Sequence, residues 1–250
     1  MNKSECYKKK IYTFFSAGDE MIPYSGLCLK TWKKNLPKDY EIEIINNSKI
    51  FSYISRNLLP GPIEAVCSSP LFFDYLALNV LYNNGGIFLR PHIVMTEKFK
   101  PCELLIESSD LVFYYNMDLY NCCPGFYMAK RGSLLLKNML DRFFTASDMC
   151  LSKIFFHSLR DVKYGRFLGI DAENTGFLME KSLFGVYNEY IHKKYYFTDI
   201  CSWDEFVKTS KGLTLLNCLW LPEKYKKMGE FEFLNQNILL SKIFKKILYV

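Results

Sequence analysis

Strand-like and helix-like segments alternate through the first ninety residues, and this alternation limits the fold more than any other feature of the sequence. The predicted strands, rich in β-branched and aromatic residues, are 11–15, 40–45 and 87–89. The predicted helices, marked by helical apolar spacing, are 24–35, 49–57 and 70–83. Such alternation predicts an α/β protein with a mostly parallel sheet, helices on both faces and ligands at the carboxyl ends of the strands.

The rest of the chain continues this pattern less regularly. Two further strands are expected at 111–115 and 126–129, followed by a helix at 133–144 and an apolar run at 213–219. The sequence contains no repeat and no linker long enough to divide it. We therefore expect one domain of 250 residues.

Composition excludes several classes of protein. Half of the residues are hydrophobic and Gly (13) and Pro (9) are scarce, so the chain is neither disordered nor fibrous. The net charge of +6 favours a phosphate-bearing ligand or an anionic surface, but it is too small for a nucleic-acid binder. Nine cysteines without a C-x-x-C pair, and three scattered histidines, indicate reduced thiols and no structural zinc. Without a recognisable signal peptide or membrane span, we expect a cytoplasmic protein.

The segment 72–92, FFDYLALNVLYNNGGIFLRPH, carries the most specific signal. Taken by itself it reads as a core helix, a Gly-Gly turn and a core strand. It also resembles the sugar-nucleotide segment of the DXD-containing glycosyltransferases related to capsular polysaccharide enzymes, yeast initiating mannosyltransferases and glucosylating clostridial toxins. Their pattern is roughly S-D-Y-x-R-x-x-x-L-Y-x-x-G-G-I-Y-L-D-x-D. The residues in register with it, without a gap, are Asp74, Tyr75, Leu81, Tyr82, Gly85, Gly86, Ile87, Phe88 and Leu89.

Three weaker similarities support this resemblance. IYTFFSAG at 11–18 lies where the family has its first strand and uracil-binding loop. WKKNLPKDYEIEIIN at 32–46 resembles the family's W-K-x-x-x-P-x-Y-E-x-x-x-W-N stretch, and residues 174–176 resemble its T-G-P turn. The resemblance implies a GT-A fold, a nucleotide-sugar donor and retention of configuration at the anomeric carbon.

The chain departs from the family at the positions that carry chemistry. Arg90 and His92 replace the two aspartates that hold a divalent cation in relatives, and Ala77 replaces the family's arginine. An arginine cannot bind that cation, which argues against a divalent metal, and no other cofactor is indicated. Two outcomes stay open: Arg90 and His92 bind the donor diphosphate directly in a metal-independent enzyme, or catalysis has been lost. Otherwise Arg90 forms an ion pair with Glu97 or Asp110, and His92 is a plain loop residue.

The remaining predicted site residues surround the donor and the acceptor. Ser16, Ala17 and Gly18 correspond to the donor loop, and the family uses the acid at Asp74 on nucleotide or sugar hydroxyls. Gly85 and Gly86 are also assigned to donor binding, although a tight helix-to-strand turn explains them equally. Asn121 resembles an asparagine that borders the acceptor pocket and is predicted to be catalytic, with a turn-forming role as the alternative.

The C-terminal segment ILLSKIFKKILYV predicts a basic amphipathic helix. It would either lie on the anionic inner face of a membrane, which would suit a lipid-linked acceptor, or dock on the core with its lysines in solvent.

Together these features predict a glycosyltransferase that moves a hexose from a nucleotide sugar to a hydroxyl of a surface polysaccharide or glycolipid. Residues 10–130 would form the nucleotide-sugar-binding half, and residues 131–250 the acceptor side. The alternatives are a catalytically inactive homologue that binds a nucleotide sugar or a partner protein, and an enzyme that glycosylates protein side chains.

Overall fold

The computed structural model describes residues 9–16, 20, 22–54, 70–99, 110–116, 121–143, 167–171, 189–200, 202–209 and 212–250. The chain forms two compact units rather than two sequential halves. Unit 1 comprises Met1–Ser16, Pro37–Leu89 and Cys102–Ile170, and unit 2 comprises Ala17–Leu36, Arg90–Pro101 and Asp171–Val250. The expected boundary at residue 130 therefore does not coincide with a change of unit.

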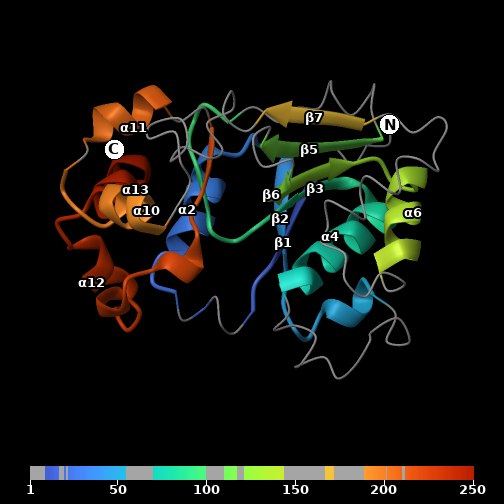
Figure 1. The fold of residues 1–250 in the computed structure, drawn as a ribbon, viewed down its shortest axis with the longest axis horizontal. Helices are drawn as coiled ribbons and strands as arrows, with labels where there is room; N and C mark the ends of the chain where they lie inside the picture. The colour runs from blue at the N-terminus through green and yellow to red at the C-terminus, as the bar shows by residue number, and fades with distance from the viewer. Residues whose placement is uncertain are drawn as a thin grey trace, which may run out of the picture. The chain divides into compact units, whose positions relative to one another are not determined.

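A six-stranded sheet forms the centre of unit 1 (Figure 1). Its strands, in spatial order, are β2 (Tyr40–Ile45), β1 (Lys9–Phe14), β3 (Gly86–Leu89), β6 (Asn121–Ala129), β5 (Leu111–Asn116) and β7 (Phe167–Asp171). β1 pairs in parallel with β2 and β3, while β6 pairs antiparallel with both β3 and β5. Consequently β1, β2, β3 and β5 share one direction, and the predicted α/β class with a mostly parallel sheet is confirmed.

The central strand of this sheet is buried. Four successive residues of β1, from Ile11 to Phe14, are buried, as expected for a central strand of such a sheet. One face packs against α4 (Pro70–Asn84), whose side chains from Phe72 to Leu81 are all buried. α6 (Leu134–Phe143) packs on α4 through one apolar side (Figure 1). Of the predicted short helix at 49–57, the described part forms the 3-10 turn η1 (Ile50–Ser52).

Unit 2 is mainly helical. Its elements are α2 (Ser25–Asn35), β4 (Ile93–Met95), α10 (Glu189–Tyr196), α11 (Trp203–Thr209), β8 (Leu213–Leu215), η4 (Cys218–Trp220), η5 (Glu223–Tyr225), α12 (Glu230–Leu234) and α13 (Leu239–Tyr249). β4 and β8 pair antiparallel, and α2 packs on β4. Two hydrogen bonds fix that packing: the Trp32 indole donates to the Ile93 carbonyl (2.6 Å), and the Asn35 amide donates to the Met95 carbonyl (2.9 Å).

Helix α13 closes the core of unit 2. Its apolar side chains, including Leu240 and Phe244, are buried among those of α2, α10, α11 and α12. Among the described helices, none combines the length and hydrophobicity that a bilayer crossing requires.

Candidate functional site

The carboxyl ends of the parallel strands β1, β2 and β3 lie at one edge of the sheet in unit 1. Ser16 follows β1 by two residues, and Asn46 directly follows β2. The Phe15 amide donates to the Ile45 carbonyl (2.8 Å), so the segments that end β1 and β2 stay hydrogen-bonded up to this edge. The carboxyl edge is where open α/β sheets bind ligands. The structure thus places Ser16 where a donor loop is expected, while its contact with a donor stays a prediction.

Asn121 also lies at the carboxyl edge, for a topological reason. β6 runs antiparallel to β3, and Phe126 is paired with Leu89, the last residue of β3. The residues of β6 that precede Phe126 therefore extend past the end of β3. Asn121 is the first of them and pairs with Asn116, the last residue of β5. Sequence reasoning missed Asn116 because the predicted strand stopped at residue 115, and a polar residue ending a strand was the signal available.

Asp74 lies in the second turn of α4, near the carboxyl edge. The tight turn after α4 makes this helix antiparallel to β3, so its first turns approach the carboxyl ends of the strands. The carboxylate is only 5% exposed and accepts a hydrogen bond from the Tyr127 hydroxyl (3.3 Å). A buried carboxylate requires such partners. Tyr127, a residue of strand β6, therefore fixes the position of the Asp74 carboxylate near the carboxyl edge.

Gly85 and Gly86 lie at the opposite, amino edge of the sheet, which differs from the predicted donor-binding role. Both have positive φ values, of 70° and 101°. A Cβ atom on Gly85 would approach the Arg131 amide nitrogen to 2.8 Å, and one on Gly86 would approach the Lys10 carbonyl oxygen to 2.8 Å. The two glycines are thus explained by the turn from α4 into β3. We do not retain them as donor ligands.

Arg90 directly follows Leu89 in the chain and is the first residue of its segment in unit 2. Its side chain is half-buried, and the guanidinium Nε is inaccessible to solvent. Its predicted contact with the donor diphosphate stays a prediction.

His92 occupies the core of unit 2 rather than an open loop. It is 5% exposed, and its ring meets the Tyr24 ring edge to face, with centroids 6.1 Å apart. Its carbonyl oxygen accepts a hydrogen bond from the Leu216 amide (2.9 Å), which extends the ladder between β4 and β8. Packing therefore accounts for the burial of this histidine, and its predicted catalytic role stays a prediction. Two other predicted donor residues, Ala17 and Gly18, lie outside the described residues.

His192 is a strongly perturbed titratable group that sequence reasoning did not single out. It is fully buried beside the Tyr196, Phe197 and Trp220 rings. Burial, aided by the positive charge of Lys193, lowers its pKa from 6.5 to about 3. The neutral ring accepts a hydrogen bond at Nε2 from the Asn217 amide (3.3 Å). These contacts indicate a structural role. Within the described ranges, no three His, Cys, Asp or Glu side chains gather as a metal site would require.

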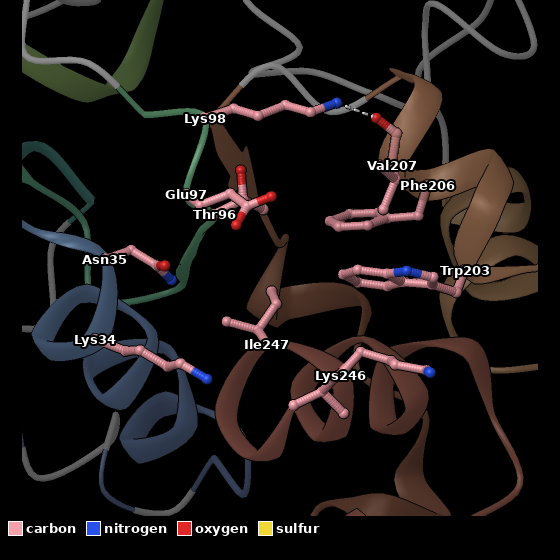
Figure 2. A pocket seen from close by; sticks show the side chains of 11 residues that line it. Lys34, Asn35, Thr96, Glu97, Lys98, Trp203, Phe206, Val207, Lys246 and Ile247 are labelled. Atoms are coloured by element: carbon pink, nitrogen blue, oxygen red, sulfur yellow. Dashed lines mark hydrogen bonds between the residues drawn. The ribbon is translucent and has the colours of Figure 1, made fainter.

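A pocket of about 420 Å³ lies entirely within unit 2 (Figure 2). Its lining comes from α2, the turn after β4, α11 and the end of α13. Three of its side chains are lysines, and Trp203 and Phe206 extend into it from α11. Sequence reasoning did not find this pocket, because its walls come from segments that lie far apart in the chain, between Lys34 and Val250.

Comparisons with known proteins identify the fold. No protein-family model and no curated protein sequence matches the chain. The structure of the glycosyltransferase GlyE of Streptococcus pneumoniae TIGR4 aligns with 97% of this chain and 60% of its own, at 10% identity and a TM-score of 0.52. Its apo form aligns over the same shares at 10% identity, with a TM-score of 0.51. The apo structure of the bifunctional glycosyltransferase WbbM covers the whole chain with 51% of its own length, at 9% identity and a TM-score of 0.46.

The chain thus spans about 60% of the length of the GlyE structure that it matches. At this level of identity the similarity concerns the backbone and not the site residues. The alternation of strands and helices, the sheet order and this alignment all agree on one conclusion: the chain has the α/β fold of GT-A glycosyltransferases.

Proposed function

We propose that the chain is a glycosyltransferase that moves a hexose from a nucleotide-sugar donor to a hydroxyl of a surface polysaccharide or glycolipid. One observation carries the proposal: a GT-A fold, matched to GlyE over almost the whole chain, has polar residues at the carboxyl edge of its sheet. Ser16, Asn116 and Asn121 come to this edge from three different strands. Asparagine and serine side chains suit the hydroxyl groups of a ribose or a hexose.

Asp74 has a supporting position in the proposed donor site. Its carboxylate is oriented by Tyr127 and lies near the edge, where it would accept hydrogen bonds from donor hydroxyls. Its partner holds the charge in place before a donor binds, which reduces the reorganisation needed on binding.

Arg90 supplies the proposed electrostatic part of the reaction. When the bond between the anomeric carbon and the phosphate oxygen breaks, negative charge grows on the diphosphate leaving group. Relatives neutralise this charge with a divalent cation, but arginine at position 90 and a packed histidine at 92 do not form a ligand set for one. A guanidinium can instead form paired hydrogen bonds to phosphate oxygens.

If the acceptor is linked to a lipid, the enzyme must work at a membrane surface. The part of α13 that would contact this membrane differs from the apolar side that the sequence indicated. The apolar side of α13 is buried in the core and is not available for a bilayer. Beside it, however, Phe231 and Tyr249 are 81% and 66% exposed and line a groove with Lys245 and Lys246. Exposed aromatic rings among lysines suit the headgroup region of an anionic membrane.

Calorimetric titration with UDP-, GDP- and ADP-hexoses, each with EDTA and then with manganese, tests this function. We expect one donor to bind in EDTA and to lose most of its affinity in Arg90→Ala, because the phosphate charge is then left without its cation. The matched control is Arg131→Ala, which removes an exposed arginine of unit 1. Binding that requires manganese would contradict the role of Arg90. Binding without hydrolysis or transfer in any glycan mixture would contradict an enzymatic function.

A further inference from the structure

The pocket of unit 2 contains the chemical groups of a carbohydrate site, and we propose that it binds a sugar that carries a single anionic group. The proposal goes beyond the function proposed above, because it concerns residues of unit 2 alone and holds whether or not the chain transfers a hexose. The pocket volume of about 420 Å³ lies within the range of small-ligand sites.

Asn35 provides a fixed hydrogen-bond acceptor on one wall. Its amide nitrogen donates to the Thr31 carbonyl (3.0 Å) and to the Met95 carbonyl (2.9 Å). Both partners are acceptors, so they define which end of the amide is nitrogen and use its hydrogens. The amide oxygen is left to accept from a ligand hydroxyl. Figure 2 shows Asn35 on the wall opposite Trp203 and Phe206.

The turn after β4 provides a second acceptor. The Phe99 amide donates to the Thr96 carbonyl (3.0 Å), and the Thr96 amide donates to the Gly212 carbonyl (2.8 Å). Gly212 has a φ of 141°, and a Cβ there would meet Phe99 Cα at 2.8 Å. The turn is therefore closely packed against Gly212. It presents the exposed carboxylate of Glu97 to the pocket.

Three lysines give the pocket its positive charge. The Lys98 amine donates to the Val207 carbonyl and so ties the turn to α11. Lys34 and Lys246 line the pocket from α2 and α13. The lining thus carries three ammonium groups and one carboxylate side chain, and this excess of positive charge attracts a ligand of low negative charge.

Apolar surface completes the lining. Trp203 is half-exposed and packs on the fully buried Phe206, with ring centroids 5.6 Å apart, and Ile247 adds aliphatic surface. Sugars combine hydroxyl groups, which both donate and accept, with an apolar C–H face that packs on aromatic rings. A uronic acid or a sugar monophosphate adds one anionic group for the lysines. A nucleoside diphosphate is less suitable, because Glu97 would repel its higher charge.

Ligand-observed and protein-observed NMR titrations test the site with three probes: methyl β-D-glucuronide, the neutral methyl β-D-glucoside and UMP. We expect the glucuronide to bind about fivefold or more tightly than the glucoside, as partly exposed charge pairs allow. The double variant Lys34→Ala, Lys246→Ala should abolish this preference. Trp203→Ala should weaken the binding of both sugars. Lys245→Ala, one position away on α13 and outside the pocket, is the control that should preserve the preference.

Equal binding of the two sugars, an acid preference that survives the lysine variants, or tighter binding of UMP through these residues would overturn the proposal. The lysine variants change surface side chains, and their circular dichroism melting curves check that the fold is intact. This outcome is separable from that of the proposed function, which is tested by nucleotide-sugar titration of Arg90→Ala. A chain that binds the glucuronide here but no nucleotide sugar would support this site and reject that function.

Discussion

The two units place their polar residues by different physical means. In unit 1, the sheet edge gathers Ser16, Asn116 and Asn121 because strand direction determines where each strand ends. In unit 2, the pocket gathers Lys34, Glu97 and Lys246 because helices from distant parts of the chain pack together. The first arrangement depends on backbone topology and the second on side-chain packing. Substitutions that disturb the backbone should therefore act most strongly on the sheet, and surface substitutions should act on ligands alone.

The largest expected effect is at the turn that directs α4 into the sheet. Gly86→Ala should lower the free energy of unfolding by about 3 kcal/mol, since it combines a positive φ with a Cβ that would meet the Lys10 carbonyl oxygen at 2.8 Å. Urea unfolding measures the change. Gly132→Ala is the matched control, because it has a φ of 73° but open space around the new Cβ. If both variants lost the same stability, backbone packing would not explain Gly86.

A smaller effect is expected in unit 2 when the pH is lowered. The pKa of His192 is about 3 in the folded protein against 6.5 as its ordinary value, so the unfolded chain binds the proton first. Stability is complete above pH 6.5 and declines as the pH falls toward 3. Between pH 7 and pH 5 the loss from this group is about 2 kcal/mol. Urea unfolding at both pH values should show a smaller difference in His192→Gln, and an unchanged difference would exclude His192 as the cause.

Removal of the Asp74 carboxylate should have a still smaller effect on unit 1. Asp74→Ala removes the buried hydrogen bond that the Tyr127 hydroxyl donates to the carboxylate, which should lower the free energy of unfolding by about 1–2 kcal/mol. Tyr127→Phe should have a similar effect, and the double variant should lose less than the sum of both. Additive losses in this double-mutant cycle would show that the two groups do not interact.

The smallest effect concerns the aromatic and lysine groove of unit 2. Replacing both Phe231 and Tyr249 by Ala should weaken binding to vesicles of phosphatidylcholine and phosphatidylserine about threefold, as expected for exposed rings at a membrane interface. Sedimentation with vesicles measures it. Tyr190→Ala removes a ring that is 71% exposed outside this groove and is the control. Equal binding by the wild type and the double variant would remove this groove from the membrane proposal.

The fold of unit 1 was predictable because its signals are local. The strand at 40–45 is observed as Tyr40–Ile45, and the predicted helix at 70–83 differs from α4 by one residue, since apolar runs and a Gly-Gly turn specify them directly. The order and direction of the strands also place Ser16 at the carboxyl edge, as expected, while its role in donor binding stays a prediction.

Where the sequence left two readings open, long-range packing decides between them. His92 looked like a loop residue after a proline, but Tyr24 and Leu216 come from distant segments to bury it. The amphipathic C-terminal segment has the same pattern whether its partner is a membrane or a protein core, and here α2, α10, α11 and α12 cover it. The pocket of unit 2 could not be predicted for the same reason. The hydrophobic periodicity of the sequence indicates which segments are helices but not which helix ends contact one another.

Hydrogen–deuterium exchange in the presence of the tightest-binding nucleoside diphosphate tests the central claim, that the donor binds at the carboxyl edge of the sheet. The account predicts slower exchange in peptides that contain 15–16, 46–47 and 116–121, and unchanged exchange in peptides from α11 and α13. Protection confined to α11 and α13, or no protection by any nucleotide, would contradict it.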